Sequence, residues 1–180
     1  MSVQEDRREA FYCDHLQKAG GHSPNFDALS IEIAVGLSHT YDILQQQLSR
    51  SLARYGLSKS TVNILLILRY GPTEGMQLHD LGELLLVSRA NVTGLIDHME
   101  SKGYVRRVVD PHDRRVRFAR ITKKARALLD RYMPVHYRRV KSLLRDLSSQ
   151  QKQALATLLK EARQSVLANS QSGNEENQVA

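Results

Sequence analysis

The residue types best suited to chemistry lie in the middle of the chain, where residues 110–115 read Asp-Pro-His-Asp-Arg-Arg. Two adjacent arginines at the tip of an exposed ribbon repel each other, so Arg114 and Arg115 bring the isolated protein no obvious stability. They fit entry into a DNA minor groove, where the negative potential is enhanced. Asp110 and Asp113 could orient the two guanidinium groups through charge-assisted pairs. An ordinary charged hairpin is the alternative interpretation.

A second group of polar candidates precedes this run, at the predicted start of a helix over residues 89–102. The outward positions of its first turns are Ser88, Arg89, Ala90, Asn91 and Thr93. Asparagine can pair with adenine in a bidentate way, arginine with guanine, and an alanine or threonine methyl can touch a thymine methyl. Helix starts are commonly polar, however, so the group can equally be a set of solvated positions beside a capping serine.

The charge distribution favours a polyanionic partner. Residues 102–126 hold ten Lys and Arg against two Asp, in a chain whose formal net charge is +7. A net charge by itself indicates little, but a patch this concentrated is typical of a surface that binds phosphate.

These candidates need elements that hold them in place. A short helix over residues 78–85, with the small residue Gly82, precedes a tight turn at Leu86 and the helix that Ser88 caps and Gly103 ends. The β-branched and aromatic runs 104–109 and 115–121 flank a proline-containing turn and predict an antiparallel ribbon. Together they predict a helix-turn-helix followed by a wing. Many such motifs have glycine where this chain has Leu86.

Longer helices surround this unit. An apolar stripe over residues 29–55 predicts a helix that either belongs to the core or lies between subunits. Residues 61–70 predict a core helix, and residues 123–144 predict a helix that Pro134 should bend. The last helix, after a capping box at Ser148, carries an apolar face made of Leu155, Leu158, Leu159, Ala162 and Val166.

At this point the chain resembles the MarR family of winged-helix transcription regulators. The residues that carry the resemblance are 87–89 (Val-Ser-Arg), 96–103 (Ile-Asp-His-Met-Glu-Ser-Lys-Gly), 110–115 and 121–122 (Ile-Thr). The family usually has an acidic residue and a glycine where this chain has Lys123 and Ala125. The resemblance implies a mainly α fold with a small β-hairpin wing, and a homodimer.

The domain organisation follows from these elements. We expect a flexible N-terminal arm over residues 1–27 and a single domain over 28–168. In that domain, residues 57–122 form the winged helix-turn-helix, and 28–56 and 123–168 are dimerisation helices. Residues 169–180, which have no capacity to form a core, should be disordered.

Regulation by a small molecule is also implied by the resemblance alone. Members of the family often release DNA when an anionic phenolic or aromatic compound binds between the dimer helices and the winged domain. By alignment with the family, His39 and His136 fall near that crevice. Histidines in helices are more often packed or solvated, which is the alternative for both.

Other chemistry has little support. One cysteine excludes an internal disulfide framework, and Cys13 lies well before the helix in which some family members carry a redox cysteine. The seven histidines show no close pair with metal-ligand spacing, and no phosphate loop, nucleophile elbow or HExxH run is present, so we expect no enzyme, metal or cofactor. Asp97 and Glu100 are expected to be solvated. No stretch predicts a membrane span or a signal core, which favours the cytoplasm.

The sequence therefore predicts a dimeric, sequence-specific regulator that binds double-stranded DNA at a pseudo-palindromic operator, most simply as a repressor. Two alternatives stay open. One is a winged-helix module that binds protein, or nucleic acid non-specifically, through the basic hairpin. The other is a redox-switched regulator that acts through Cys13.

Overall fold

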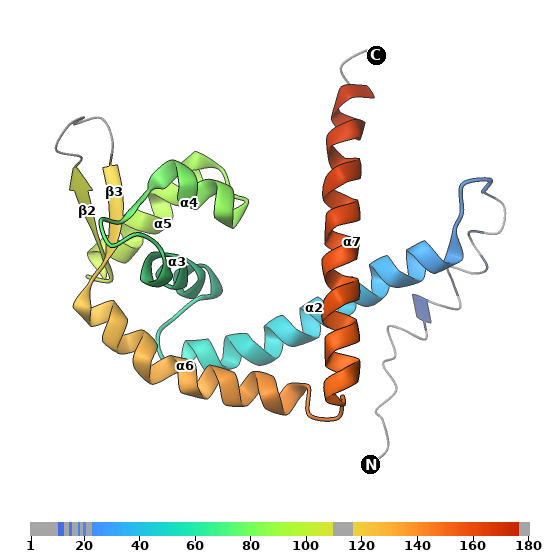
Figure 1. The fold of residues 1–180 in the computed structure, drawn as a ribbon, viewed down its shortest axis with the longest axis horizontal. Helices are drawn as coiled ribbons and strands as arrows, with labels where there is room; N and C mark the ends of the chain where they lie inside the picture. The colour runs from blue at the N-terminus through green and yellow to red at the C-terminus, as the bar shows by residue number, and fades with distance from the viewer. Residues whose placement is uncertain are drawn as a thin grey trace. The chain divides into compact units, whose positions relative to one another are not determined.

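The structure is a computed structural model that describes residues 11–12, 15, 18, 20, 23–109 and 117–176, with the side chains of Arg89 and of residues 171–176 left out. It is mainly helical with one small sheet, as predicted (Figure 1). The elements in chain order are α2 (Ala28–Ala53), α3 (Lys59–Tyr70), β1 (Met76–Gln77), α4 (Leu78–Leu85), α5 (Arg89–Ser101), β2 (Val105–Val109), β3 (Arg117–Ile121), α6 (Lys123–Leu143) and α7 (Ser149–Glu176).

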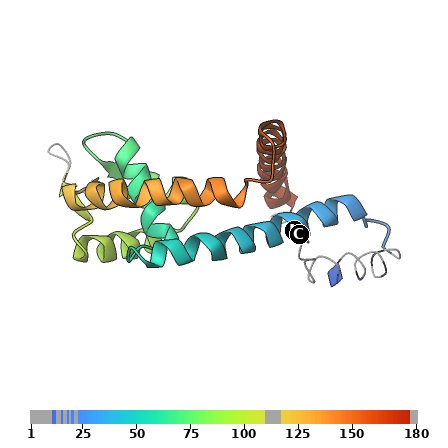
Figure 2. The ribbon, with the colours of Figure 1, turned by 90° about the horizontal axis from the view of Figure 1, so that it is seen from below.

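The chain forms two compact units, one that ends at His136 and one that begins at Tyr137. In the first, helices α3, α4 and α5 contact one another, and the view from below in Figure 2 shows the same group. The apolar side chains at its centre are fully or almost fully buried: Ile64, Leu65, Leu81, Val92, Ile96, Met99, Leu129 and Tyr132. Each such side chain contributes on the order of 1.5–3 kcal/mol relative to exposure.

The sheet has three strands in the order β1-β3-β2, all antiparallel. The hairpin of β2 and β3 was predicted, and it pairs Val105 with Ile121 and Val109 with Arg117. The strand β1 was not predicted, because two residues carry no recognisable period. It is held close to β3 by Gly75, whose φ of 110° lies in the left-handed region and whose added Cβ would meet the Ala119 carbonyl oxygen at 2.6 Å.

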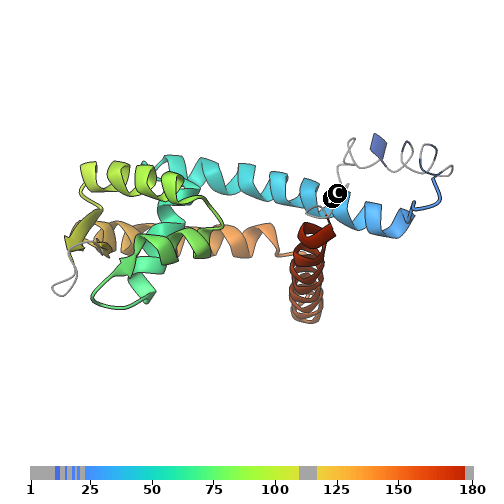
Figure 3. The same cartoon turned by 90° about the horizontal axis from the view of Figure 1, so that it is seen from above.

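Helix α6 begins directly after β3, as the view from above shows (Figure 3). Thr122 is its cap, since its Oγ1 accepts a hydrogen bond from the Ala125 amide at 3.2 Å. The same hydroxyl donates to the Gly103 carbonyl at 2.8 Å, so it ties the end of α5 to the start of α6. Pro134 lies inside α6, which continues to Leu143. The bend expected there stays a prediction.

The second unit contains the last turns of α6 and helix α7. The predicted capping box is confirmed: the Ser148 amide donates to Gln151 Oε1 at 2.8 Å, and the Gln151 amide donates to Ser148 Oγ at 3.2 Å. The helix continues to Glu176, beyond the point at residue 169 where a disordered tail was predicted to begin. A helix satisfies its own backbone hydrogen bonds without core contacts, and the disordered tail stays a prediction. Residues 177–180 lie outside the described residues.

Helix α2 exposes the first half of its predicted stripe. Ile33, Leu37 and Tyr41 are 50%, 42% and 51% exposed, whereas Leu52 near its end is 6% exposed and joins the core. Only the end of the helix therefore packs as a core helix. No helix within the described residues is both apolar enough and long enough to cross a membrane.

Candidate nucleic-acid interface

The turn between α4 and α5 is tight and uses an unusual residue. Leu86 has φ 52° and ψ 44°, in the left-handed region, and its side chain is 86% exposed. The Val87 amide donates to the Gly82 carbonyl at 3.1 Å, which closes the turn. A Cβ at Gly82 would lie 3.3 Å from the Val87 carbonyl oxygen, so the small residue allows the two helices to meet. The predicted helix-turn-helix is confirmed, with leucine in the conformation that glycine adopts most easily.

Helix α5 has one buried and one exposed face. Val92, Ile96 and Met99 are at most 1% exposed and anchor the helix in the core. At its start, Ser88 Oγ accepts a hydrogen bond from the Asn91 amide at 3.4 Å, which makes Ser88 the cap, as predicted. The predicted contact residues with described side chains are all exposed at this end of the helix: Ser88, Ala90, Asn91 and Thr93. The side chain of Arg89 is outside what the structure describes.

The end of α5 is fixed as the sequence predicted. Gly103 has φ 70°, the left-handed conformation of a helix C-terminal glycine. Its amide donates to the Glu100 carbonyl at 2.8 Å, and the Tyr104 amide donates to the Met99 carbonyl at 2.9 Å. The chain therefore turns directly from α5 into β2, which places the wing strands against this helix.

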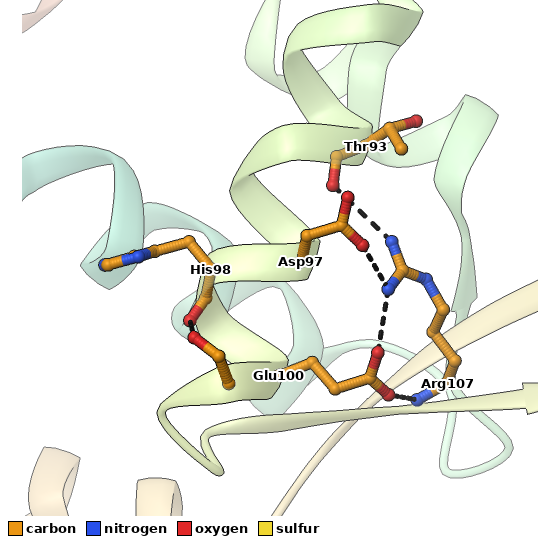
Figure 4. Close-up of polar contacts among 6 residues, drawn as sticks. Thr93, Asp97, His98, Glu100 and Arg107 are labelled. Atoms are coloured by element: carbon orange, nitrogen blue, oxygen red, sulfur yellow. Dashed lines mark hydrogen bonds and ion pairs between the residues drawn. The ribbon is translucent and has the colours of Figure 1, made fainter.

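Arg107 on β2 binds three groups of α5 at once (Figure 4). Its Nη1 lies 2.5 Å from Asp97 Oδ1 and 2.7 Å from Glu100 Oε2. Its Nη2 donates to the Thr93 carbonyl at 3.4 Å, and its backbone amide donates to Glu100 Oε1 at 2.8 Å. We call these four residues, Thr93, Asp97, Glu100 and Arg107, the arginine clamp.

The arginine clamp changes the ionisation of Glu100. Hydrogen bonds from the backbone amide and then the guanidinium of Arg107 hold the pKa of Glu100 below its ordinary value of 4.5. The prediction that Asp97 and Glu100 are merely solvated was wrong. Sequence reasoning missed the clamp because the run Val-Arg-Arg-Val-Val in β2 does not alternate, so it does not reveal which arginine faces α5.

Gly94 is a further residue that the sequence reasoning passed over. It lies on the exposed side of α5, and a Cβ added there would have no heavy atom within 4 Å. A glycine inside a helix costs about 1 kcal/mol relative to alanine. The fold does not need this glycine for space, whereas a ligand backbone that approaches closely would.

Four of the predicted site residues cannot be placed. Asp110, Asp113, Arg114 and Arg115 at the tip of the wing lie outside the described residues, as does Cys13. The strands that carry the tip are described up to Val109 and from Arg117.

The structure does not bring the two candidate effector residues together in any contact between described residues. His39 on α2 is half-buried, its ring lies 5.2 Å from that of Tyr12, and its Nδ1 is buried without a hydrogen-bond partner. His136 Nδ1 lies 3.2 Å from the Tyr132 hydroxyl, and burial lowers the pKa of His136. In the described part of the chain, no group of three His, Cys, Asp or Glu is arranged to hold a metal ion.

The amino-acid sequence is similar to those of known regulators. A sequence model described as "MarR family" matches residues 55–116. The transcriptional regulator MhqR of Bacillus subtilis is 26% identical over 131 residues, which cover 73% of this chain and 89% of that protein. The transcriptional activatory protein BadR of Rhodopseudomonas palustris is 50% identical over 52 residues, which cover 29% of this chain and 30% of that protein.

Solved structures show the same fold. A MarR family regulator from Streptomyces coelicolor in complex with DNA superposes with a TM-score of 0.72 at 22% identity, over 81% of this chain and 92% of that one. CouR from Rhodococcus jostii bound to p-coumaroyl-CoA superposes with a TM-score of 0.65 at 21% identity, over 78% of this chain and 95% of that one. Residues 55–116 therefore match the MarR family model, and the chain has the fold of MarR regulators.

By their names, the relatives MhqR and BadR act on transcription, one as a regulator and one as an activatory protein. The family match covers the helix-turn-helix and the wing tip, which are the parts that carry the predicted contact residues. The arginine clamp lies within the same matched residues. The longer MhqR alignment extends the likeness to most of the chain.

Proposed function

We propose that the protein is a regulator of transcription that binds double-stranded DNA sequence-specifically. The observation that carries this proposal is the start of α5, where Ser88, Ala90, Asn91 and Thr93 are exposed on a helix whose opposite face is buried. A major groove admits such a helix, and its base edges carry a unique pattern of donors and acceptors.

Each residue has a defined role in this proposal. Asn91 suits bidentate pairing with adenine and Arg89 with guanine, while Ala90 and Thr93 offer methyl groups to thymine. Ser88 lies at the helix start, where backbone amides and a hydroxyl suit a phosphate.

The wing adds contacts in the neighbouring minor groove. Arg114 and Arg115 would enter that groove, with Asp110 and Asp113 orienting them. The arginine clamp supports this proposal because it fixes β2 relative to α5. The distance between α5 and the wing, the two elements proposed to contact DNA, therefore stays constant.

We further propose that the protein acts as a homodimer. Apolar side chains on α2 and α7 are exposed in the single chain: Ile33, Leu37, Tyr41, Leu155, Leu158 and Val166. A second copy with two-fold symmetry would cover them and would present two α5 helices. The operator would then be pseudo-palindromic, with half-sites about 10 bp apart.

Release by a small aromatic or phenolic effector completes the proposal. CouR, whose structure contains p-coumaroyl-CoA, supports this class of ligand. His39 and His136 are the candidate effector residues. The effector binds the conformation of the dimer in which the two α5 helices are spaced incorrectly for DNA. In the absence of the effector, the simplest outcome of DNA binding at a promoter is repression.

The test is fluorescence anisotropy with labelled DNA from upstream of the protein's own gene, at two salt concentrations and with unlabelled unrelated DNA as competitor. We expect a preference for the operator of on the order of 10³ over unrelated DNA. Asn91→Ala should weaken operator binding by about 10-fold, which is about 1.4 kcal/mol. Asn63→Ala, at an exposed position on α3, is the matched control and should bind as wild type.

The wing is tested in the same assay. Arg114→Ala/Arg115→Ala should abolish tight binding, while Arg138→Ala/Arg139→Ala removes the same charge from an adjacent arginine pair on α6 and should not. Equal affinity for operator and unrelated DNA would contradict the proposal. It would favour a module that binds nucleic acid non-specifically through the basic hairpin.

A further inference from the structure

A cavity of about 220 Å³ lies on the far side of the wing sheet from α5, and three arginines line it: Arg106, Arg120 and Arg126. Successive side chains of a strand point to opposite faces. Because Arg107 contacts α5, its neighbour Arg106 points away from that helix. Arg120 lies directly opposite Arg106 in the pairing of β2 with β3, so it shares this face. The cavity therefore lies outside the proposed major-groove surface.

The three arginines raise the energy of the isolated protein. Like charges directly opposite each other in an antiparallel pair are destabilising, by up to about 1 kcal/mol. Arg126 adds a third positive charge. In the described residues no carboxylate contacts any of the three, whereas Arg69 pairs with Asp130 at 2.7 Å and Arg107 with two carboxylates. Within the part of the chain that the structure describes, this arginine group thus has no anion of its own.

One wall of the cavity is held rigidly. The Nε and Nη2 of Arg120 donate to the Thr73 carbonyl at 2.9 and 2.6 Å, which orients the guanidinium and leaves its Nη1 uncommitted. Gly75, which also lines the cavity, has φ 110° and lies against the backbone of Ala119, where a Cβ would clash. The loop and the strand therefore form one preorganised surface, which lowers the entropy lost on binding.

We propose that this cavity binds a small anion that carries a phosphate or carboxylate group. Guanidinium groups present paired N–H donors that match both, and Arg106 and Arg126 have their donors free for such a ligand. The volume is below the roughly 300 Å³ of pockets for drug-sized ligands, so it suits inorganic phosphate or a small carboxylate.

Occupation of the cavity has a structural consequence. The anion would contact both wing strands and the first turns of α6, and it would turn the repulsion between Arg106 and Arg120 into two attractions. It would therefore favour one position of the hairpin relative to α6. This inference does not rest on DNA binding, since a free anion is the ligand.

The experiment is isothermal titration calorimetry on the full chain in a buffer poor in anions. Inorganic phosphate and benzoate are titrated separately, as the phosphate and carboxylate probes. We expect at least one of them to bind wild type with a Kd of about 1 mM or below, and Arg106→Gln/Arg126→Gln to bind it at least 10-fold more weakly. Arg131→Gln/Arg138→Gln, at two exposed positions of α6, removes the same charge outside the cavity and should bind as wild type.

Thermal melting provides the second readout. For the probe that binds, a concentration of 10 mM should raise the Tm of wild type by about 4 °C more than the Tm of the cavity variant, measured at matched ionic strength. Without the probe, the cavity variant should melt at the wild-type temperature or above it, because the repulsion among the cavity arginines is relieved. Arg126→Gln alone, at an exposed helix position, gives the same comparison should the double variant fail to fold.

Two results would overturn the proposal. In the first, neither probe binds wild type. In the second, a probe affects wild type and the cavity variant equally, as a general salt effect would. If neither probe binds and the cavity variant also loses affinity for DNA, the cavity is instead a contact for the DNA backbone. A loss of operator specificity with intact anion binding would instead affect only the proposed function.

Discussion

The arginine clamp can be removed by one substitution that keeps most of the packing. Arg107→Met retains the aliphatic stem of the side chain but loses both ion pairs with α5. The Arg107 side chain is 17% exposed, whereas the side chains of Asp97 and Glu100 are 60% and 39% exposed, so solvent screens each pair considerably. About 1 kcal/mol for each pair, at the upper end for exposed pairs, is therefore appropriate. Repulsion between the two carboxylates left on α5 adds a few tenths of a kcal/mol.

The free energy of unfolding should therefore fall by about 2 kcal/mol, which lowers the Tm by about 6 °C. Urea unfolding followed by circular dichroism at pH 7 measures it. Arg117→Met, at an exposed position on β3, is the matched control and should change the stability by less than about 0.5 kcal/mol. The double variant Arg107→Met/Asp97→Asn should be destabilised by less than the sum of the two single variants, since both substitutions remove the same Arg107–Asp97 ion pair.

The pH dependence adds a second check. Because the folded protein holds the pKa of Glu100 below 4.5, the stabilisation is complete above that pH and is lost as the pH falls through the folded pKa. The difference between wild type and Arg107→Met should therefore be largest near pH 7 and shrink below pH 4.5. Operator affinity should fall about 10-fold, since the wing is no longer held to α5. A variant as stable as wild type at pH 7 would refute the reasoning and show that solvent screens the clamp fully.

Three further substitutions test single features. Leu86→Gly should raise the free energy of unfolding by about 1 kcal/mol, because it relieves a left-handed φ at an exposed residue; Leu86→Ala keeps that φ and should bring no gain. Gly94→Ala should stabilise the protein by about 1 kcal/mol in the same urea assay. The same substitution should weaken operator binding in the anisotropy assay, and unchanged binding would show that DNA does not approach this point of α5. Burial lowers the pKa of His136, so protonation of this side chain favours the unfolded state, and stability should decrease as the pH falls below 6.5. His136→Gln should reduce this dependence of the Tm on pH in thermal melts. An unchanged dependence would assign it to other groups.

The helices of the winged region could be predicted because their ends depend on local signals. Ser88 and Gly103 each act on backbone groups only a few residues away, and the structure has the predicted contacts at both. The buried face of α5 followed from its helical period for the same reason. The hairpin also lies within a short stretch, so its existence was predictable from residue types.

The arginine clamp and the strand β1 could not be predicted, because both depend on how separate elements of the fold pack together. Met76 pairs with Ala119, which lies 43 positions later, and no local pattern marks so short a strand. In β2, the two neighbouring arginines have opposite surroundings: Arg107 binds α5, and Arg106 lines the cavity. A shift of one residue in register would exchange these roles, so only the packed sheet decides them.

Three features of the winged region cost stability, and all three lie away from the core. Leu86 adopts a left-handed φ, Gly94 leaves empty space on a helix, and Arg106 faces Arg120 across two strands. Natural proteins concentrate such departures from local preference at positions that serve a function. Close approach of DNA to α5 accounts for Gly94, and an anion between two guanidinium groups accounts for the arginine pair. Replacing Gly94 should therefore lower DNA binding, and replacing Arg106 should lower anion binding, while the fold stays equally or more stable. Both residues differ in this from Arg107, whose loss should lower both stability and DNA binding.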